Sequence, residues 1–307
     1  MRVIMLFRNL FCECLALITI ASGRVRRAQG RALNSLNVTP IYFHNPNKRL
    51  FTKCIRWLKT HGYAFISAED LIEIVHGRQT PPKRAVWLSF DDGARDLLTS
   101  VVPVVRRYRV PVTLFIPSGI IAGDGLFPWL HDNGSEQTRS DIRDALTLLE
   151  LKQVAQYQEI SVGSHTVSHS VTPNLTDEQL LFELEESKRA LELWTGRDVR
   201  CFAYPVGQVD GRERTVLASL GYSLGATTEA SFIAHSTDPY LLPRFCVGDN
   251  IPFPEAICCM TGVWRPVINP FIRLFRCICA IPVLTSLRGY LVREREFQSV
   301  WRTTIGN

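Results

Sequence analysis

The chain has 307 residues, of which 46% are hydrophobic and 21% are charged, a composition that excludes a disordered or fibrous protein. The net charge of +6 is unevenly distributed, because residues 1–31 and 264–307 each carry +5, which leaves −4 for residues 32–263. This acidic centre argues against a nucleic-acid partner, since a nucleic-acid-binding fold carries its basic surface on the domain itself.

The N-terminal arm, residues 1–31, mixes arginines with apolar residues. Its apolar run 10–23 contains Glu13 and is shorter than the roughly 20 residues of a membrane-spanning helix. The run is similar to the apolar part of a signal peptide, but four arginines between residues 24 and 31 oppose translocation. We therefore expect a membrane-associated helix or a signal-like segment.

Residues 32–263 are expected to form one domain, in which short segments rich in β-branched and aromatic residues alternate with helical patterns. The predicted strands are 41–43, 85–90, 112–116, 160–164, 200–204, 222–227 and 242–247. The predicted helices are 50–61, 94–107, 148–156, 176–195 and 212–220, and the polar segment 123–144 is expected to be a long loop. This alternation predicts an α/β fold with a parallel sheet or a barrel.

Two adjacent carboxylates, Asp91 and Asp92, directly follow the predicted strand 85–90. Adjacent residues at a strand end can point in different directions, so one carboxylate can bind a metal while the other stays free as a base. The structural alternative is a helix cap, because an aspartate before helix 94–107 can accept hydrogen bonds from its free N–H groups.

Two histidines four residues apart, His165 and His169, follow the predicted strand 160–164. This spacing is used by many metal sites, although a single histidine is more often an ordinary surface or core residue. Two histidines and an aspartate at the carboxyl ends of strands form a three-ligand site with open positions for water. We therefore expect a catalytic metal centre.

Helix 176–195 has the clearest boundaries. Thr176 and Gln179 form a capping box at its start, and Gly196 stands where a left-handed C-cap is expected. Leucines, including Leu184, lie on one side of this helix, and Glu183 is expected to point away from them.

The C-terminal arm, residues 264–307, resembles the N-terminal arm, because Phe271 and Ile272 alternate with Arg273. For both arms we leave two alternatives open, an interfacial helix on an anionic membrane surface or packing on the central domain. The nine cysteines are odd in number and clustered, which argues against a disulfide framework and favours a reducing compartment, and thus the cytoplasmic side of a membrane over export.

Three segments in order resemble the motifs of the NodB-like polysaccharide deacetylases of carbohydrate esterase family 4. They are Phe-Asp-Asp-Gly at 90–93, His-Thr-x-x-His at 165–169 and Phe-Ala-Tyr-Pro-x-Gly at 202–207. The resemblance covers residues 38–250 and implies a distorted, incomplete (β/α) barrel of about seven strands, with its site at the carboxyl ends of the strands.

The resemblance also implies roles for individual residues. Asp91 corresponds to the general base of the family, and its metal ligands correspond to Asp92, His165 and His169. The backbone N–H of Val206 is placed at the oxyanion. Three further residues are expected to bind substrate: His44, Tyr204 and Pro205. For His44, which ends the first predicted strand, a hydrogen-bonded turn is the alternative.

The chain departs from the family pattern at two points. The third motif lacks the arginine that orders the base, and the last strand lacks a Leu-x-His segment whose histidine is the general acid. Arg244 is expected near the site, where its charge can hold Asp91 ionised, or else it is an ordinary surface or interface residue. The general acid is left unassigned, because Asp91 itself can return the proton.

The expected activity is removal of N-acetyl groups, or as a second choice O-acetyl groups, from an acetylated glycan by metal-activated water. The expected cofactor is a divalent metal, and zinc suits two histidines and an aspartate by ligand type. The alternative is a catalytically impaired carbohydrate-binding or scaffold protein on the same barrel. The two missing motif residues favour this alternative, and the complete set of base and metal positions opposes it.

Overall fold

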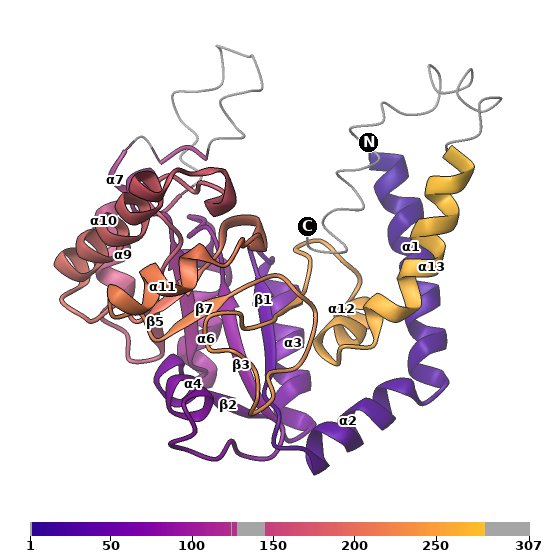
Figure 1. The fold of residues 1–307 in the computed structure, drawn as a ribbon. Helices are drawn as coiled ribbons and strands as arrows, with labels where there is room; N and C mark the ends of the chain where they lie inside the picture. Colours follow the sequence, from indigo (N-terminus) through magenta and orange to yellow (C-terminus); the bar gives the residue numbers. More distant parts are fainter. Residues whose placement is uncertain (1, 124, 128–144, 280–307) are drawn as a thin grey trace.

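The computed structural model of the protein describes residues 2–123, 125–127 and 145–279 (Figure 1). Most of the loop expected at 123–144 and most of the C-terminal arm lie outside the described residues.

A parallel sheet curls into an incomplete barrel at the centre of the molecule (Figure 1). Seven strands follow the order β7-β6-β5-β4-β3-β1-β8, and β2 pairs with β3 beside this path. A parallel bridge between Ala226 and Leu242 connects β7 to the segment that enters β8. These observations confirm the predicted α/β barrel. The strand bounds are β1 (Thr39–Phe43), β2 (Ala64–Ile66), β3 (Ala85–Phe90), β4 (Val112–Ile116), β5 (Ile160–Ser164), β6 (Cys201–Ala203), β7 (Leu224–Ala226) and β8 (Phe245–Cys246).

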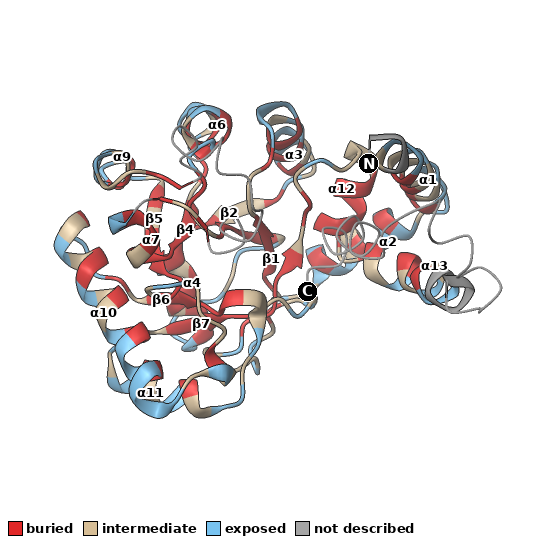
Figure 2. Cartoon of the chain, turned by 90° about the horizontal axis from the view of Figure 1, so that it is seen from above, coloured by how far each residue is buried: buried red, intermediate tan, exposed pale blue. Residues whose placement is uncertain are grey.

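Helices surround the sheet, as the view from above shows (Figure 2). Those of the barrel are α3 (Lys48–Thr60), α4 (Ala68–Val75), α5 (Leu97–Ser100), α6 (Val102–Tyr108), α7 (Ser118–Ala122), α9 (Leu148–Val154), α10 (Asp177–Thr195) and α11 (Arg212–Ser219), with the short 3-10 helices η1 (Thr172–Asn174) and η2 (Pro205–Gly207). Four more, α1 (Arg2–Ala21), α2 (Arg24–Asn34), α12 (Phe253–Met260) and α13 (Trp264–Cys279), lie together at one flank of the barrel.

The seven predicted strands all occur, with ends that differ by a few residues. The short strand β2 and helix α4 were not predicted. The predicted helix 94–107 is divided into α5 and α6, because Pro103 lies in the first turn of α6 and has no N–H to continue the hydrogen bonds of α5. The predicted capping box is confirmed, with Gln179 N donating to Thr176 Oγ1 at 3.3 Å.

Alternation along β3 divides its side chains between two apolar layers. Val86, Leu88 and Phe90 belong to the layer between the sheet and the outer helices, whereas Trp87 faces the inside of the barrel. Successive side chains of a strand point to opposite faces, so Ser89 and the next odd position also face inward. The strand therefore directs one carboxylate of the aspartate pair into the barrel.

The two arms share the apolar core of the barrel helices. Cys12 and Ala16 of α1 and Ile268 of α13 are fully buried in the same cluster as the outer side of β3. Phe11 and Phe271 bring α1 and α13 into edge-to-face contact, with ring centroids 5.5 Å apart. The inner sides of these helices thus pack on the domain, as one of the two alternatives predicted.

No single helix among the described residues is long and apolar enough to cross a membrane. The pair formed by residues 5–21 and 24–34, bent by 60°, passes the test of length and composition only when taken together.

Candidate active site

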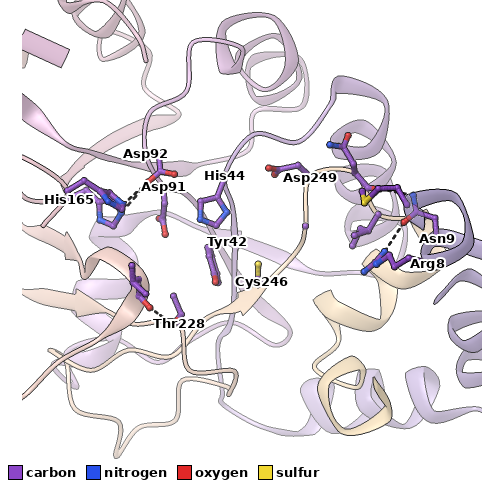
Figure 3. A pocket seen from close by; sticks show the side chains of 16 residues that line it. Arg8, Asn9, Tyr42, His44, Asp91, Asp92, His165, Thr228, Cys246 and Asp249 are labelled. Carbon is purple, nitrogen blue, oxygen red and sulfur yellow. Dashed lines mark hydrogen bonds and ion pairs between the residues drawn. The ribbon is translucent and has the colours of Figure 1, made fainter. Parts of the chain in front are cut away.

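Asp91 and Asp92 stand at the carboxyl end of β3, where Figure 3 shows their side chains diverging. Asp91 N donates to Phe43 O at 3.0 Å, which extends the ladder to β1 by one residue. Asp92 then adopts a left-handed conformation with φ 72°, so its carboxylate leaves the direction of the strand. Neither aspartate caps the next helix, because α5 begins only at Leu97.

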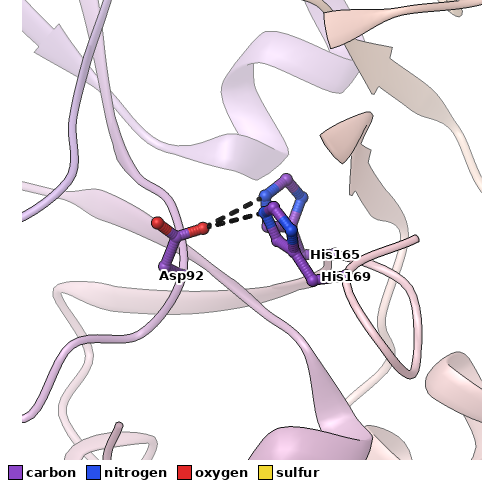
Figure 4. A group of neighbouring side chains, drawn as sticks. All are labelled: Asp92, His165 and His169. Atoms are coloured by element: carbon purple, nitrogen blue, oxygen red, sulfur yellow. Dashed lines mark ion pairs between the residues drawn. The ribbon is translucent and has the colours of Figure 1, made fainter. Parts of the chain in front are cut away.

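Asp92 faces the two histidines predicted as its co-ligands (Figure 4). Its Oδ1 lies 3.4 Å from His165 Nε2 and 3.2 Å from His169 Nε2. One ligand atom from each of the three residues lies within 4.8 Å of the others, which is compatible with one shared ion. The structure therefore brings together the residues that the resemblance implied as metal ligands.

The donor set fits a divalent metal. His165 Nδ1 donates to Ala203 O at 2.7 Å, since a carbonyl can only accept, and this leaves the lone pair of Nε2 toward Asp92. Asp92 Oδ1 is buried and accepts no hydrogen bond of regular geometry. A buried carboxylate oxygen facing two imidazole nitrogens is the arrangement that a bound cation satisfies.

The charges of these residues are strongly coupled. Burial alone raises the pKa of Asp92, but the adjacent imidazoles of His165 and His169 outweigh this effect and hold that pKa well below its usual value. Burial lowers the pKa of His165, whereas the neighbouring carboxylates of Asp92 and Asp91 raise it, and the net shift is upward. An anionic Asp92 is the form in which a carboxylate binds a metal.

The loop between the two histidines is held by Glu183 of α10. Glu183 Oε2 accepts hydrogen bonds from Val167 N at 2.7 Å and Ser168 N at 2.9 Å, and its Oε1 accepts one from Ser168 Oγ at 2.6 Å. The expectation that Glu183 points away from the buried side was wrong, because its carboxylate turns toward this loop and accepts the hydrogen bonds of these N–H groups. It is one helical turn from Leu180 and Ser187, a spacing that could have indicated its burial.

Arg244 forms a buried ion pair with Asp91. Its Nη1 and Nη2 donate to the two carboxylate oxygens at 2.7 and 2.8 Å, and Nη1 also donates to Ser89 Oγ at 3.0 Å. The guanidinium is fully buried inside the barrel, stacks over the Tyr42 ring at 4.4 Å and donates through Nε to Thr227 O. The structure thus places Arg244 in the contact with Asp91 that the sequence had suggested.

A cavity of about 400 Å³ contains the carboxylates and histidines (Figure 3). His44 lies on its wall next to Tyr42, with ring centroids 5.5 Å apart. The lining residues are Met5, Arg8, Asn9, Tyr42, His44, Asp91, Asp92, His165, His169, Val206, Thr228, Cys246, Gly248, Asp249, Asn250 and Ile251. A cavity of this size in which several titratable side chains converge is a candidate ligand-binding or catalytic site.

Val206 lines the cavity in a strained conformation. Its φ is 62°, a value that a β-branched residue rarely adopts. Residues with such strained backbone conformations are more frequent at functional sites than elsewhere. The next residue, Gly207, also has a positive φ of 76°, and a Cβ there would lie 2.1 Å from Thr228 Oγ1. The turn after β6 is therefore fixed by close packing.

Two other residues of the motif at 202–207 lie outside the cavity lining. Tyr204 and Pro205 are buried and do not belong to the cavity lining. The Tyr204 hydroxyl donates to Tyr240 O at 2.8 Å, and its ring packs edge-to-face on Phe202. The structure therefore places both residues outside the cavity lining, because the strand alternation turns Tyr204 into the core instead of the cavity, and substrate binding by them stays a prediction.

Several cavity residues were not predicted. Asp249 accepts a hydrogen bond from Asn45 N at 2.8 Å, and burial raises its pKa above the ordinary value. Met5, Arg8 and Asn9 reach the cavity from α1. No sequence signal indicates these contacts, because they depend on how α1 packs against a segment about 240 residues away.

The polysaccharide deacetylase family model matches residues 78–225, the part of the chain that contains both carboxylates and both histidines. The chain belongs to the polysaccharide deacetylase family. Other members of this family are distant relatives. Poly-beta-1,6-N-acetyl-D-glucosamine N-deacetylase of Staphylococcus aureus is 24% identical over 244 residues, which cover 74% of this chain and 77% of that protein. YxkH of Bacillus subtilis, which carries a polysaccharide deacetylase name, is 25% identical over 204 residues, or 66% of each chain.

Solved structures show that this deacetylase shares its fold with other proteins. The Streptococcus pyogenes deacetylase PplD, in complex with acetate, matches with a TM-score of 0.62 and 22% identity, covering 73% of this chain and 98% of that one. IcaB from Ammonifex degensii matches with a TM-score of 0.59 and 18% identity, covering 73% and 99%. At these identities the likeness shows the incomplete barrel alone.

Proposed function

We propose that the protein is a metal-dependent hydrolase that removes N-acetyl groups from a carbohydrate. The observation that carries this proposal is the juxtaposition of two carboxylates with different environments in one cavity. Asp91 is paired with a buried guanidinium, whereas Asp92 faces His165 and His169. The name of the Staphylococcus aureus relative, an N-deacetylase of an N-acetylglucosamine polymer, supports the choice of substrate class.

Asp92, His165 and His169 would hold the divalent ion, for which zinc suits the ligand types. When bound, such an ion supplies a Lewis acid that lowers the pKa of water and polarises a carbonyl group.

Asp91 acts as the general base. Arg244 engages both carboxylate oxygens and fixes the orientation of Asp91, while further lone pairs remain available to accept a proton from water. The water oxygen attacks the acetyl carbon, and the Val206 backbone N–H stabilises the negative charge that forms on the carbonyl oxygen. Val206 lines the cavity with a φ of 62°, and such strained conformations are more frequent at functional sites, which supports this role.

Breaking the C–N bond releases acetate and an amine, which requires a proton on the leaving nitrogen. Either Asp91 returns the proton that it has accepted, or His44 on the cavity wall supplies one. His44 stands beside Asp249, which accepts a hydrogen bond from the adjacent Asn45 N. His44 lines the same cavity as Asp91 and Asp92, so its imidazole is the second group placed to donate this proton.

The alternative of an impaired sugar-binding protein is not favoured. It was supported by two missing motif residues, one of them an arginine, whereas Arg244 pairs with Asp91 in this structure. This pair and the grouping of Asp92, His165 and His169 support an active enzyme over the alternative.

Acetate release tests this function. Metal-free protein is assayed on N-acetylated glucosamine oligomers before and after addition of zinc, cobalt or manganese, with His169→Ala as the control for contaminating activity. We expect release that depends on added metal and is absent in the variant. Release by the metal-free protein at the same rate as the reconstituted one would contradict metal dependence.

We further propose that the protein associates peripherally with an anionic membrane surface. Helix α2 contains no acidic residue, and Arg24, Arg26, Arg27 and Arg31 are all exposed on it. Each arginine near an anionic bilayer contributes about 1 kcal/mol, and this attraction weakens with ionic strength. Flotation of the full chain with anionic vesicles at low and high salt tests this proposal, which fails if the chain stays with the soluble fractions at low salt.

A further inference from the structure

Helix α1 presents an apolar surface that the described part of the protein leaves uncovered. Five large side chains on it are more than half exposed: Leu6 (69%), Phe7 (68%), Leu10 (58%), Leu17 (51%) and Ile18 (66%). At about 100° per residue, these positions occupy roughly one third of the helix circumference. We call this surface the outer face of α1.

The opposite side of the same helix belongs to the protein interior. Cys12 and Ala16 are fully buried, and α1 packs along α12, so that exposed residues of α1 lie on its side away from the barrel (Figure 2). Arg8 of α1 and Glu255 of α12 form a buried, bidentate ion pair with distances of 2.7 and 2.5 Å. Loss of one partner from such a pair leaves a buried charge, so the ion pair fixes α1 in this position.

The inner side of α1 is also a wall of the catalytic cavity. Met5, Arg8 and Asn9 line the same hollow as Asp91 and Asp92. Figure 3 shows Arg8 and Asn9 at its end remote from His165. Asn9 Nδ2 donates to the backbone oxygen of Asn250, which ties this wall to the loop after β8. One helix therefore separates the catalytic cavity from an exposed apolar surface.

We propose that the outer face of α1 lies in the surface of an anionic bilayer and that the substrate is an acetylated saccharide carried on a lipid. This inference rests on the deacetylation proposed above and names its substrate class. An α-helix with its side chains is about 10–12 Å across, so the cavity lies about one helix thickness from the lipid. To reach Asp92, a saccharide head group anchored in the bilayer must span this distance and the length of the cavity, while its lipid stays in the membrane.

The apolar character of the outer face and the positive charge next to it favour a lipid bilayer as its binding partner. The outer face contains no charged residue, and the exposed arginines of α2 follow it directly along the chain. An apolar face continuous with a basic segment is the pattern of helices that lie in an anionic lipid interface. A second copy of this chain, which would cover the face by forming a dimer, is the competing occupant and is separated by the experiment below.

The experiment uses two substrates with the same sugar. An N-acetylated glucosamine disaccharide is supplied either free or linked to a long alkyl chain in vesicles of phosphatidylcholine and phosphatidylglycerol. The test variant carries Leu6→Gln, Phe7→Gln and Leu10→Gln, none of which lines the cavity. The matched control carries Phe182→Gln and Leu193→Gln on α10, two equally exposed apolar residues remote from α1 (58% and 72%).

We expect the wild type and the α10 control to hydrolyse the vesicle-borne sugar at least about tenfold faster than the free sugar. The α1 variant should lose this preference and bind the vesicles about 100-fold more weakly, because three large apolar side chains no longer enter the lipid. Its rate on the free sugar should equal that of the wild type.

Three results would overturn the inference. Equal wild-type rates on the two substrates would exclude the lipid-linked substrate, and a wild-type dimer that the α1 variant converts to monomer would assign the outer face to a second copy. No acetate from either substrate, with vesicle binding intact and dependent on the outer face, would instead refute the proposed deacetylation and its lipid-linked substrate, while supporting the bilayer as the occupant of α1.

Discussion

Arg244 binds Asp91 in a chain whose third motif lacks an arginine. The guanidinium reaches Asp91 from the segment that closes the barrel, and both of its terminal nitrogens bind the carboxylate. The pair is almost completely buried, with side-chain exposures of 0% and 4%. Removing one partner of a buried pair leaves an uncompensated charge, whereas removing both can cost little.

The burial of the Arg244–Asp91 pair leads to a prediction for the free energy of unfolding. Arg244→Gln should lower it by about 3–5 kcal/mol, because the Asp91 carboxylate then remains buried without its cation. The combination of Arg244→Gln with Asp91→Asn should be less destabilised than the sum of the two single variants. Urea unfolding of the wild type, both single variants and the double variant measures this coupling. Strict additivity would show that the two side chains do not stabilise each other.

His44 is the residue to test for proton donation to the leaving nitrogen. If it is the donor, His44→Gln should keep the bound metal and lower the turnover rate by about 100-fold or more. The control is His235→Gln, which changes an exposed histidine outside the cavity. A turnover rate within about twofold of the wild type, a loss too small for general acid catalysis, would assign both proton transfers to Asp91.

At the scale of elements, local signals predict where helices and strands begin, but not which side chains they place at the site. The capping box at the start of α10 and the C-cap Gly196 (φ 68°) after its end could both be predicted from the sequence, because their hydrogen bonds join residues close together in the chain. The partners of Glu183 in the histidine loop are 15 and 16 residues away and depend on the packing of α10 against β5.

Glu183 should therefore control metal affinity without touching the metal. Glu183→Gln loses one acceptor for the N–H groups of Val167 and Ser168, so His169 is less well positioned and the affinity for zinc should fall by about 10–100-fold. Glu185→Gln changes an exposed acid on the same helix and should leave the affinity unchanged. Zinc titration of both variants decides the point, and equal affinities would show that the loop holds His169 without Glu183.

At the scale of the whole molecule, the barrel could be predicted and the position of the arms could not. The alternation of strands and helices and the order of the motifs suffice for the barrel, because parallel strands bring their carboxyl ends to one edge. The charge and apolar residues of the N-terminal arm were visible in the sequence. Its packing on α12 and its approach to the cavity depend on contacts such as Arg8–Glu255, which are 247 residues apart.

A local backbone conformation, which the sequence does not indicate, decides where the residues of the third motif lie. Tyr204 and Val206 are two residues apart, yet one is buried in the core and the other lines the cavity. The left-handed conformation of Val206 changes the direction of the chain after β6, and no local pattern predicts a positive φ at a valine.

The central claim is that Asp91 is the base and that Asp92, His165 and His169 hold the metal. The most direct test measures bound metal per chain together with the rate of acetate release in Asp91→Asn. This variant keeps the size of the side chain but cannot accept a proton, so we expect wild-type metal content and a rate lowered by about 100-fold or more. His165→Ala serves as the reference that loses metal and activity together. An Asp91→Asn protein with full metal content and the wild-type rate would contradict the account.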